Sequence, residues 1–326
     1  MKPFKEKKGV VAKNGTKRRI KQLKLKNAAR LRDSVGVIES KKVLKTCFLN
    51  VDGLSEATLE DIKTTVNLKT PDIIILVETK RRKESSNADI SIPGYSVFEN
   101  LRSDQANDKD GGGIAVYTKL EDGILFKPHT PDIIDTTSAF VDNERVWVTV
   151  ESQSCKTAIC GLYLGCQHPD NRNSDWNDTI YHTLQQESFS LRSQGYRVVY
   201  LGDFNGHVGD KHGEGVPGNK SDINQNGRKF LDFLTRTDSV HINGSERIPG
   251  RWETRLTKGL WTRQRAGSSS VLDFGVISSE HLSSVISMEI DDRGEFGTLS
   301  DQLVISQFVG QVCEATPYFN PTSEEK

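Results

Sequence analysis

An aspartate and an asparagine directly follow an apolar run, and together their side chains could carry out acid–base chemistry. Residues 198–205 read Val-Val-Tyr-Leu-Gly-Asp-Phe-Asn, which places Asp203 and Asn205 just beyond the run. The run is too short for a helix and predicts a buried strand. Catalytic groups gather at strand ends in layered α/β folds. A carboxylate beside a carboxamide pairs a base with a neutral donor, which suits water activation next to an anionic phosphate.

Other polar residues stand at or within apolar runs in the same way. One such residue says little, because a strand end needs a polar cap. Several would converge if their strands shared one sheet edge. The residues of this kind are Asn50, Asp52, Glu78, Tyr163, Asp203, Asn205, Asp273, Ser300 and Asp301.

Three of these residues could hold a metal ion. Asn50, Glu78 and Asp301 all offer oxygen donors, which favours a hard cation such as Mg²⁺, with Mn²⁺ as a second candidate. Zinc would favour Cys and His. A divalent ion here would neutralise a phosphate and stabilise a leaving oxygen. Asp203 could then deprotonate the attacking water, and Asn205 could hold a phosphate oxygen.

Short apolar runs predict the strands that would position these residues. Apolar residues at helical spacing predict helices over 59–68, 176–191 and 227–236. This mixture, with hairpin-like strand pairs, predicts an α/β sandwich of two sheets under helices. Residues 206–226, rich in Gly, His, Asp and Asn, predict a long loop. The predicted strands cover residues 44–50, 73–78, 113–118, 146–151, 157–164, 197–201, 271–277 and 303–308.

The charge of the chain is unevenly distributed. Its 326 residues have no net charge, but residues 1–32 carry 13 Lys and Arg against one Glu. We expect a basic tail over residues 1–42, a globular domain over residues 43–310 and a second tail over residues 311–326. The basic tail is typical of polyanion binding or nuclear import, and equally of a solvated terminus.

The cysteines and the hydropathy bear on the compartment. Five cysteines without Cys-x-x-Cys spacing, and no signal peptide, favour a reducing, intracellular setting. Cys160, Cys166 and His168 could suggest zinc, but we favour ordinary thiols because Cys160 falls among strand residues. No apolar run approaches the ~20 residues of a membrane span, so we expect no membrane partner.

Six short motifs occur in an order that resembles the endonuclease/exonuclease/phosphatase superfamily, from Asn50 to about Ile305. Each motif is weak alone, and their order makes the likeness specific. The resemblance implies a four-layered α/β sandwich of two mixed β-sheets flanked by helices, and metal-dependent phosphodiester hydrolysis. The motifs are Asn50-Val51-Asp52-Gly53-Leu54, Leu76-Val77-Glu78-Thr79-Lys80, Gly111-Gly112-Gly113-Ile114-Ala115-Val116, Gly202-Asp203-Phe204-Asn205, Val271-Leu272-Asp273-Phe274 and Leu299-Ser300-Asp301-Gln302.

Within the superfamily, the chain is most similar to the apurinic-type endonuclease domain of non-LTR (LINE) retrotransposons. The likeness rests on the sequence GDFNGHVG over 202–209, on Asn224-x-Asn226-Gly227-Arg228, and on Trp261-Thr262 upstream of Asp273. It implies DNA as partner, a nuclear location and a reverse transcriptase domain in a longer parent protein. The oligomeric state is left open.

The resemblance also implies roles for single residues. Asn50, Glu78 and Asp301 would lie near the metal, and Tyr163 near the phosphate. The implied catalytic residues are Asp203, Asn205, Tyr163, Asp273, Asp301 and Gln302. The residues expected to bind substrate are Asn50, Asn205, Asn226, Trp261 and Arg263, although Trp261 could instead be a core residue and Arg263 part of an ordinary exposed loop.

The chain departs from the family pattern at Gln302, where the family has the histidine of Ser-Asp-His. That histidine contacts the scissile phosphate and pairs with the aspartate matched by Asp273. Glutamine can donate a hydrogen bond but cannot carry a proton at neutral pH. Losing a general acid–base group costs roughly 10²–10⁴ in rate. A degenerate copy, an engineered inactive variant and a natural site that tolerates glutamine are the competing explanations.

We therefore expect a Mg²⁺-dependent DNA endonuclease that nicks a target strand in retrotransposon fashion, with activity in question because of Gln302. Three alternatives remain at this point. They are an abasic-site repair nuclease, a catalytically silent nucleic-acid-binding relative, and a phosphatase of the superfamily. The basic tail and the GDFNGHVG sequence favour DNA over a lipid headgroup.

Overall fold

A computed structural model of the protein shows two β-sheets with helices beside them. The predicted tails over residues 1–42 and 311–326 lie outside the described residues, so the predicted domain boundaries stay a prediction. The structure describes residues 43–82, 89–101, 112–120, 124–130, 145–151, 155–165, 174–209, 223–243, 262–265, 268–290 and 305–309.

The first of two six-stranded sheets is built around the parallel pair β1·β2, and its other pairs are antiparallel. β2 reads Ile-Ile-Ile-Leu-Val and is buried along its whole length. Such an apolar run, rich in β-branched residues, suits a strand that is covered on both faces. In spatial order the strands are β13 (Val285–Ile290), β14 (Ile305–Val309), β1 (Leu44–Asn50), β2 (Ile73–Val77), β4 (Ile114–Lys119) and β3 (Tyr95–Asn100).

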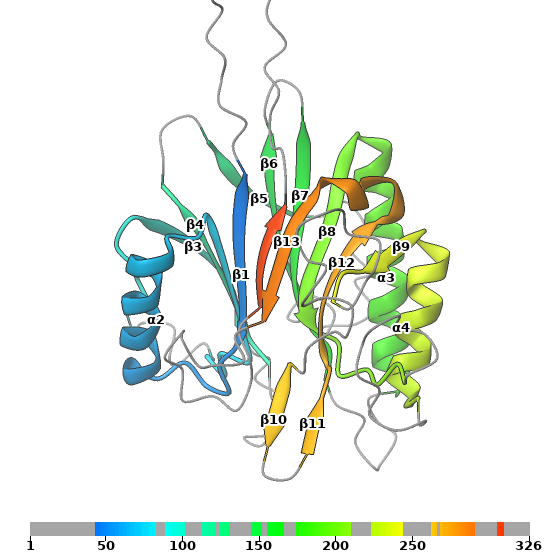
Figure 1. Ribbon diagram of the computed structural model, residues 1–326, viewed down its shortest axis with the longest axis horizontal. Helices are drawn as coiled ribbons and strands as arrows, with labels where there is room; N and C mark the ends of the chain where they lie inside the picture. Colours follow the sequence, from blue (N-terminus) through cyan, green and yellow to red (C-terminus); the bar gives the residue numbers. More distant parts are fainter. Residues whose placement is uncertain are drawn as a thin grey trace, which may run out of the picture. The chain divides into compact units, whose positions relative to one another are not determined.

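The second sheet is built around another parallel pair, β7·β8, and is antiparallel elsewhere. A separate two-stranded hairpin, β10 (Arg263–Arg265) and β11 (Ser268–Ser270), precedes β12 and projects at the lower end of the molecule in Figure 1. In spatial order the strands of the second sheet are β5 (Phe126–His129), β6 (Arg145–Glu151), β7 (Lys156–Tyr163), β8 (Tyr196–Asp203), β12 (Asp273–Ser278) and β9 (Ser239–His241).

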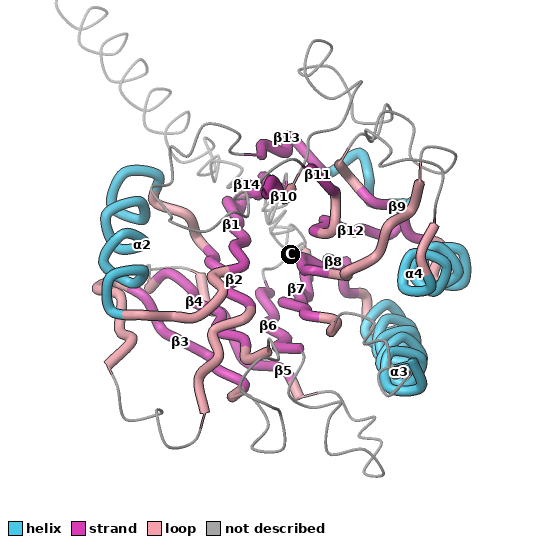
Figure 2. Tube along the Cα trace, turned by 90° about the horizontal axis from the view of Figure 1, so that it is seen from below, coloured by secondary structure: helices cyan, strands magenta, loops and turns pink. Residues whose placement is uncertain are grey.

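The sheets face each other and helices cover their outer sides, which gives four layers (Figures 1 and 2). Helix α2 (Glu56–Lys69) covers the first sheet, while α3 (Ser174–Ser193) and α4 (Gln225–Arg236) cover the second. Three apolar clusters fill the spaces between these layers. The sheets approach each other closely at Gly161, where a Cβ atom would lie 2.8 Å from Ile75 Cγ2. The predicted α/β sandwich of two mixed sheets is confirmed.

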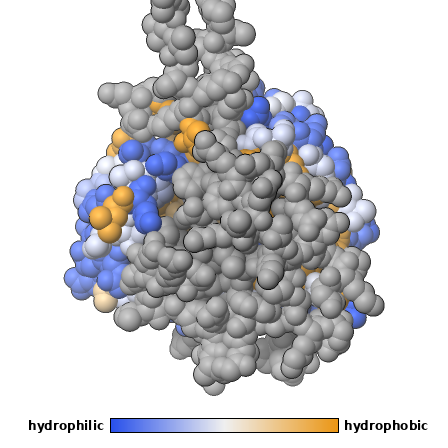
Figure 3. Space-filling view, viewed as in Figure 1, coloured by the Kyte–Doolittle hydropathy of each residue, from blue (hydrophilic) through white to orange (hydrophobic). Residues whose placement is uncertain are grey.

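The outer surface is mainly polar where the described residues are visible. Figure 3 shows hydrophilic residues at both margins, over α2 on one side and over α3 and α4 on the other, with small apolar patches. A polar outer face is expected of a helix that buries one stripe against a sheet. Among the helices that the structure describes, none is long and apolar enough to cross a membrane.

All eight predicted strands and all three predicted helices are present. β1 has the predicted ends, and each of the others begins or ends one to three residues away from its prediction. β12 begins at Asp273, so Val271 and Leu272 precede the strand. The predicted loop over residues 206–226 is wrong at its end, because α4 begins at Gln225 behind its N-cap residue Asn224. Cys160 is fully buried in β7 as a core thiol, whereas Cys166 and His168 lie outside the described residues.

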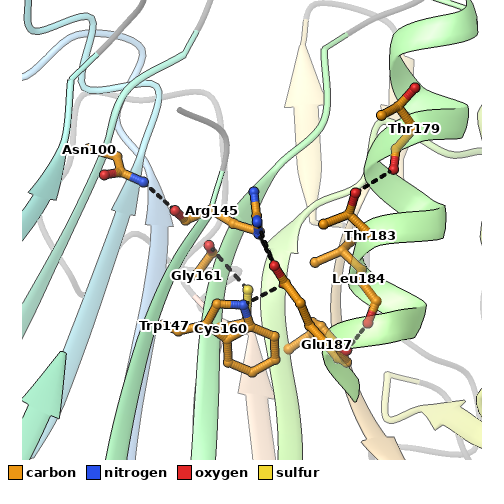
Figure 4. A network of polar contacts seen from close by, with 10 residues as sticks. Asn100, Arg145, Trp147, Cys160, Gly161, Thr179, Thr183, Leu184 and Glu187 are labelled. Atoms are coloured by element: carbon orange, nitrogen blue, oxygen red, sulfur yellow. Dashed lines mark hydrogen bonds and ion pairs between the residues drawn. The ribbon is translucent and has the colours of Figure 1, made fainter. Parts of the chain in front are cut away.

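A buried ion pair ties β6 to α3 (Figure 4). The Arg145 guanidinium donates from Nε to both carboxylate oxygens of Glu187, at 2.9 and 3.0 Å. The Trp147 indole N–H donates to Glu187 Oε2 at 2.8 Å, and Asn100 donates to the Arg145 carbonyl. Burial raises the pKa of Glu187, which the hydrogen bonds and charge of Arg145 oppose. Helix α3 is therefore fixed to the sheet by a polar contact as well as by apolar packing.

Replacing Glu187 with leucine should destabilise the protein by about 3–5 kcal/mol, because the buried Arg145 guanidinium loses this carboxylate partner. Adding Arg145→Met to Glu187→Leu should recover a large part of the loss, since the buried positive charge is then removed as well. Urea unfolding followed by circular dichroism measures both values. If the single change costs less than about 1 kcal/mol, water reaches this ion pair and the pair does not fix the helix.

Candidate active site

Polar side chains from the two sheets meet at one end of the sandwich. Asn50 ends β1 beside the end of β2, and Glu78 follows β2 directly. In the second sheet, Asp203 ends β8 and pairs in register with Tyr163 on parallel β7 and with Asp273 on antiparallel β12. The carboxyl ends of both parallel pairs therefore face one another. This is the convergence that the sequence predicts for these five residues.

Asn50 joins the two halves of the site. Its Nδ2 donates to Glu78 Oε1 at 2.7 Å and to Asp203 Oδ2 at 3.1 Å, so one amide contacts carboxylates from both sheets. Its Oδ1 accepts from the Asp52 backbone N–H at 3.1 Å. Asn50 is 1% exposed. Three hydrogen bonds thus fix the orientation of a buried amide between two acidic groups.

Burial and neighbouring negative charge raise the pKa of two carboxyls in the site, Asp203 and Glu78. Desolvation is the largest cause for Asp203, followed by the charges of Asp273 and Glu78, and the hydrogen bonds from Asn205 and Asn50 oppose it. The pKa of Glu78 is also raised, first by burial and then by the negative charge of Asp52. Hydrogen bonds from Asn50 and Tyr163 lower the pKa of Glu78. A cluster of this kind is stabilised by uptake of a proton or by binding of a cation.

The donor chemistry of this cluster fits a hard divalent cation. Carboxylate and amide oxygens suit Mg²⁺ or Mn²⁺, and Asn50, Glu78 and Asp203 supply both kinds. Within the described residues, no group of three or more His, Cys, Asp or Glu is placed to hold a metal. Asp301, the third predicted ligand, lies outside them. Its role and the complete ligand set stay predictions.

The backbone around the site is strained. Asp52, Glu78, Lys80 and Asn205 all have positive φ, at 44°, 53°, 54° and 45°. For residues other than glycine this conformation costs about 1–3 kcal/mol each, and it persists only where the surroundings impose it. Four left-handed residues around one site indicate that the fold keeps these side chains in fixed directions at some cost in stability.

Hydrogen bonds beyond the strand ends hold this strained backbone in place. Two backbone hydrogen bonds join the loop after β1 to the loop after β2. The Gly53 N–H donates to the Glu78 carbonyl at 2.8 Å, and the Leu54 N–H donates to the Thr79 carbonyl at 3.0 Å. The loop after β2 is bonded on its other side, from Thr79 N to Gly113 O at 3.1 Å. Gly113 must lack a side chain, since its φ is +83° and a Cβ atom would lie 2.5 Å from Thr79 Oγ1.

Lys80 and Asp52 form an ion pair at the rim of the site. Both side chains are partly exposed, at 31% and 62%, so this pair contributes little to stability. The two residues have opposite effects on Glu78: the charge of Asp52 raises the Glu78 pKa, and that of Lys80 lowers it. The pair therefore adjusts the potential at Glu78 more than it stabilises the loop.

The turn at the end of β8, residues 202–207, fixes the carboxylate of Asp203. Asp203 Oδ1 accepts from the Asn205 backbone N–H at 2.9 Å, and Asn205 Nδ2 donates to the Leu164 carbonyl at 2.6 Å. Phe204 points into the core, with its ring centroid 4.5 Å from that of Phe230. Gly202 permits a close approach to β7, because a Cβ atom would lie 2.4 Å from Leu162 O.

The Asn224-x-Asn226-Gly227 motif packs against this turn. Asn226 is fully buried and donates from Nδ2 to the Gly165 carbonyl at 3.3 Å. A Cβ atom on Gly227 would lie 1.9 Å from the His207 carbonyl oxygen, so the motif needs glycine at this position. The structure thus gives Asn226 and Gly227 packing contacts, and the predicted substrate contact of Asn226 stays a prediction.

Thr262 is a site residue whose contacts the sequence does not reveal. It is fully buried, and its Oγ1 accepts from the backbone N–H groups of Leu272 at 3.0 Å and Asp273 at 3.2 Å. It thereby fixes the start of β12 and the base of the β10–β11 hairpin. In the sequence, Thr262 is marked by its place in the Trp261-Thr262 pair, which resembles retrotransposon endonuclease sequences. Arg263 lies in β10, and its predicted DNA contact is untested.

Besides Asp301, two further predicted residues, Gln302 and Trp261, lie outside the described part of the chain. Gln302 cannot be placed relative to Asp273, and Trp261 cannot be placed relative to the hairpin. The consequence of glutamine at the family's histidine position therefore stays a prediction. The predicted roles of Asn50, Glu78, Tyr163, Asp203, Asn205 and Asp273 also stay predictions, although the structure brings these residues together.

Comparison with known proteins supports the fold. No protein-family model and no curated protein sequence matches the chain. The AP endonuclease LMAP from Leishmania major has 16% identity and a TM-score of 0.63, over 83% of this chain and 88% of that one. The catalytic domain of Xenopus laevis APE2 has 15% identity and a TM-score of 0.61, over 84% and 95%. The endonuclease domain of TRAS1, a telomere-specific non-LTR retrotransposon, has 11% identity and a TM-score of 0.54, over 83% and 100%.

At these identities the likeness shows the fold. The chain has the four-layered α/β fold of AP endonucleases and of a retrotransposon endonuclease domain. The resemblance inferred from six ordered motifs is confirmed at the level of the fold.

The raised pKa of Glu78 gives a prediction about pH and metal. A carboxyl whose folded pKa lies above its ordinary value of 4.5 contributes stability below that pH, and this contribution is lost as the pH rises through the folded pKa. In chelator, Glu78→Gln should therefore melt above the parent at pH 8, and the two should converge toward pH 4. Mg²⁺ should raise the melting temperature of the parent and leave that of Glu78→Gln nearly unchanged.

Glu60→Gln is the matched control, because Glu60 is an exposed glutamate on α2 that pairs with Lys63. It should behave like the parent in both series of melting curves. A Glu78→Gln protein that melts below the parent at pH 8 in chelator would show that Glu78 stabilises the fold as a charged group, contrary to this account.

Proposed function

We propose that this chain is a divalent-metal-dependent phosphodiester hydrolase that nicks DNA. The observation that carries the proposal is the Asn50 amide, which holds Glu78 and Asp203 together across the two sheets. An acidic pair of this kind, at the end of two parallel strand pairs, supplies both a place for a cation and a base next to it. The fold shared with AP endonucleases supports the same conclusion.

Each residue has a distinct part in this proposal. Asn50 and Glu78, with Asp301, would hold the metal, which when bound neutralises charge on the phosphate and stabilises the leaving oxygen. Asp203 orients the attacking water and removes its proton, and its raised pKa makes it a better base. Asn205 and Tyr163 donate hydrogen bonds to phosphate oxygens.

DNA is the proposed substrate for two reasons. Two of the matched structures are those of an AP endonuclease and of a retrotransposon endonuclease domain, and a third is that of the 3′ phosphatase NExo from Neisseria bound to a product DNA hairpin. Residues 1–32 also carry 13 Lys and Arg against one Glu, which suits a polyanion. A retrotransposon-type role, a nuclear location and a reverse transcriptase in a longer parent protein are part of the same proposal.

A second candidate function, binding nucleic acid without cutting it, is favoured by Gln302. Glutamine at the family's histidine position removes a group that could carry a proton near the phosphate. The acidic cluster and the fold would survive such a loss. The two candidates predict different results in one assay.

Nicking of a supercoiled plasmid in Mg²⁺ separates the two candidates. We expect the parent to nick, chelator to abolish nicking, and Asp203→Ala to lower the rate by roughly 10²–10⁴. Gln302→His should raise the rate. The matched control is Asp232→Ala, which removes an exposed aspartate on α4 that pairs with Arg236. It should nick like the parent.

The outcomes are distinct. A parent and a Gln302→His protein that both bind DNA without nicking it would favour the silent candidate. Nicking by Asp203→Ala at the parental rate would overturn the site assignment. An oligonucleotide cut only at an abasic position would indicate a repair-type nuclease, and cutting of intact duplex would support the retrotransposon type.

A further inference from the structure

The residue that caps α4 also contacts the catalytic turn. Asn224 Oδ1 accepts from the Gly227 backbone N–H at 2.7 Å, which is the ordinary capping bond at a helix N-terminus. The same oxygen accepts from the His207 backbone N–H at 3.0 Å. Asn224 Nδ2 donates to the Asn205 carbonyl at 3.1 Å. One side chain therefore bonds both the helix and the turn at the end of β8.

The cap of α2 shows what capping alone requires. Ser55 Oγ accepts from the Thr58 backbone N–H at 3.1 Å and also bonds the Thr58 hydroxyl. Both of these contacts stay within the first turn of its own helix. The two bonds from Asn224 to residues 205 and 207 are additional, and they use the acceptor oxygen and the donor nitrogen that an amide carries on separate atoms.

The turn that Asn224 contacts is the strained one. Asn205 has φ of 45°, its backbone N–H holds Asp203 Oδ1, and its carbonyl is held by Asn224. The peptide groups on both sides of this left-handed residue are thus fixed by side chains. The N–H that orients the Asp203 carboxylate and the carbonyl that Asn224 holds lie on the two sides of the Asn205 Cα, so the bond from Asn224 supports the left-handed conformation between them.

Close backbone packing makes the helix end a rigid support. A Cβ atom on Gly206 would lie 3.2 Å from Gly227 N, so the turn and the first turn of α4 are in direct backbone contact. The helix itself is anchored by Phe230 and Phe233, which are buried against the second sheet. A shift of the helix end would therefore move the turn with it.

We propose that Asn224 is a positioning residue for the hydrolytic reaction. It acts through Asn205 to hold the Asp203 carboxylate in its working direction. The proposal rests on the function proposed above, and it assigns to Asn224 a role that capping does not explain.

Three variants separate positioning from capping. Asn224→Asp keeps the acceptor for Gly227 and His207 but cannot donate to the Asn205 carbonyl, and Asp caps helices as well as Asn does. Asn224→Ala loses every one of these bonds. Thr237→Val is the matched control at the other end of α4, where the buried Thr237 hydroxyl bonds Phe233 O and Ser239 Oγ, away from the turn.

We expect Asn224→Asp to melt within about 2 °C of the parent, and Asn224→Ala and Thr237→Val to melt about 2–4 °C lower. In plasmid nicking, both Asn224 variants should lose about 10- to 100-fold in kcat with KM changed by less than about threefold, because a small misplacement of a catalytic group is costly. Thr237→Val should keep the parental kcat. If kcat instead followed melting temperature across the three variants, Asn224 would be a cap only.

A second measurement does not depend on activity. Hydrogen exchange of the peptide that spans residues 203–209 should be faster in Asn224→Asp than in the parent, and parental in Thr237→Val. Unchanged exchange in Asn224→Asp would overturn the positioning role whether or not the parent nicks DNA. A parent that fails to nick, with exchange altered as expected, would overturn the proposed function and leave the role of Asn224 in shaping the turn supported.

Discussion

The hydrogen bonds of one buried amide connect the two halves of this protein's candidate active site. Asn50 donates to Glu78 in its own sheet and to Asp203 in the other, so the sheets must meet at the distance that one carboxamide spans. A charged or apolar residue at this position would leave two buried carboxylates facing each other without a donor. The packing of the sandwich and the chemistry of the site therefore depend on the same contact.

The cost of the arrangement is spread over the surrounding backbone. Left-handed residues follow β1, β2 and β8, and each is held by bonds that continue past the strand ends or come from a neighbouring element. The apolar clusters supply the stability that these loops lack. A rigid sandwich with strained loops at one end is a physical basis for holding acidic groups that repel one another.

Sequence patterns predict the parts of this fold that are buried on both faces. Ile73–Val77 is a continuous apolar run, and the structure has a strand over these residues. The strands that the patterns miss are short or lie at edges: Phe126–His129 carries lysine, proline and histidine, and Ser268–Ser270 is a run of serines. Neither segment has the alternation of apolar and polar residues that predicts a strand. Each forms a strand because it pairs with a neighbouring strand.

The candidate site divides in a similar way. Asp203 and Asn205 stand out because polar residues end an apolar run, and the ordered motifs identify Glu78 and Asp273. The contacts of Asn224 join residues 17 and 19 positions apart, and those of Thr262 join residues 10 and 11 positions apart. They depend on which segments meet in space, and no local sequence pattern encodes them.

The most direct test of the central claim is the anomalous scattering of crystals soaked in Mn²⁺. The account predicts a peak in coordinating contact with Asn50 and Glu78, whereas a protein that nicks DNA with its Mn²⁺ bound elsewhere would contradict it.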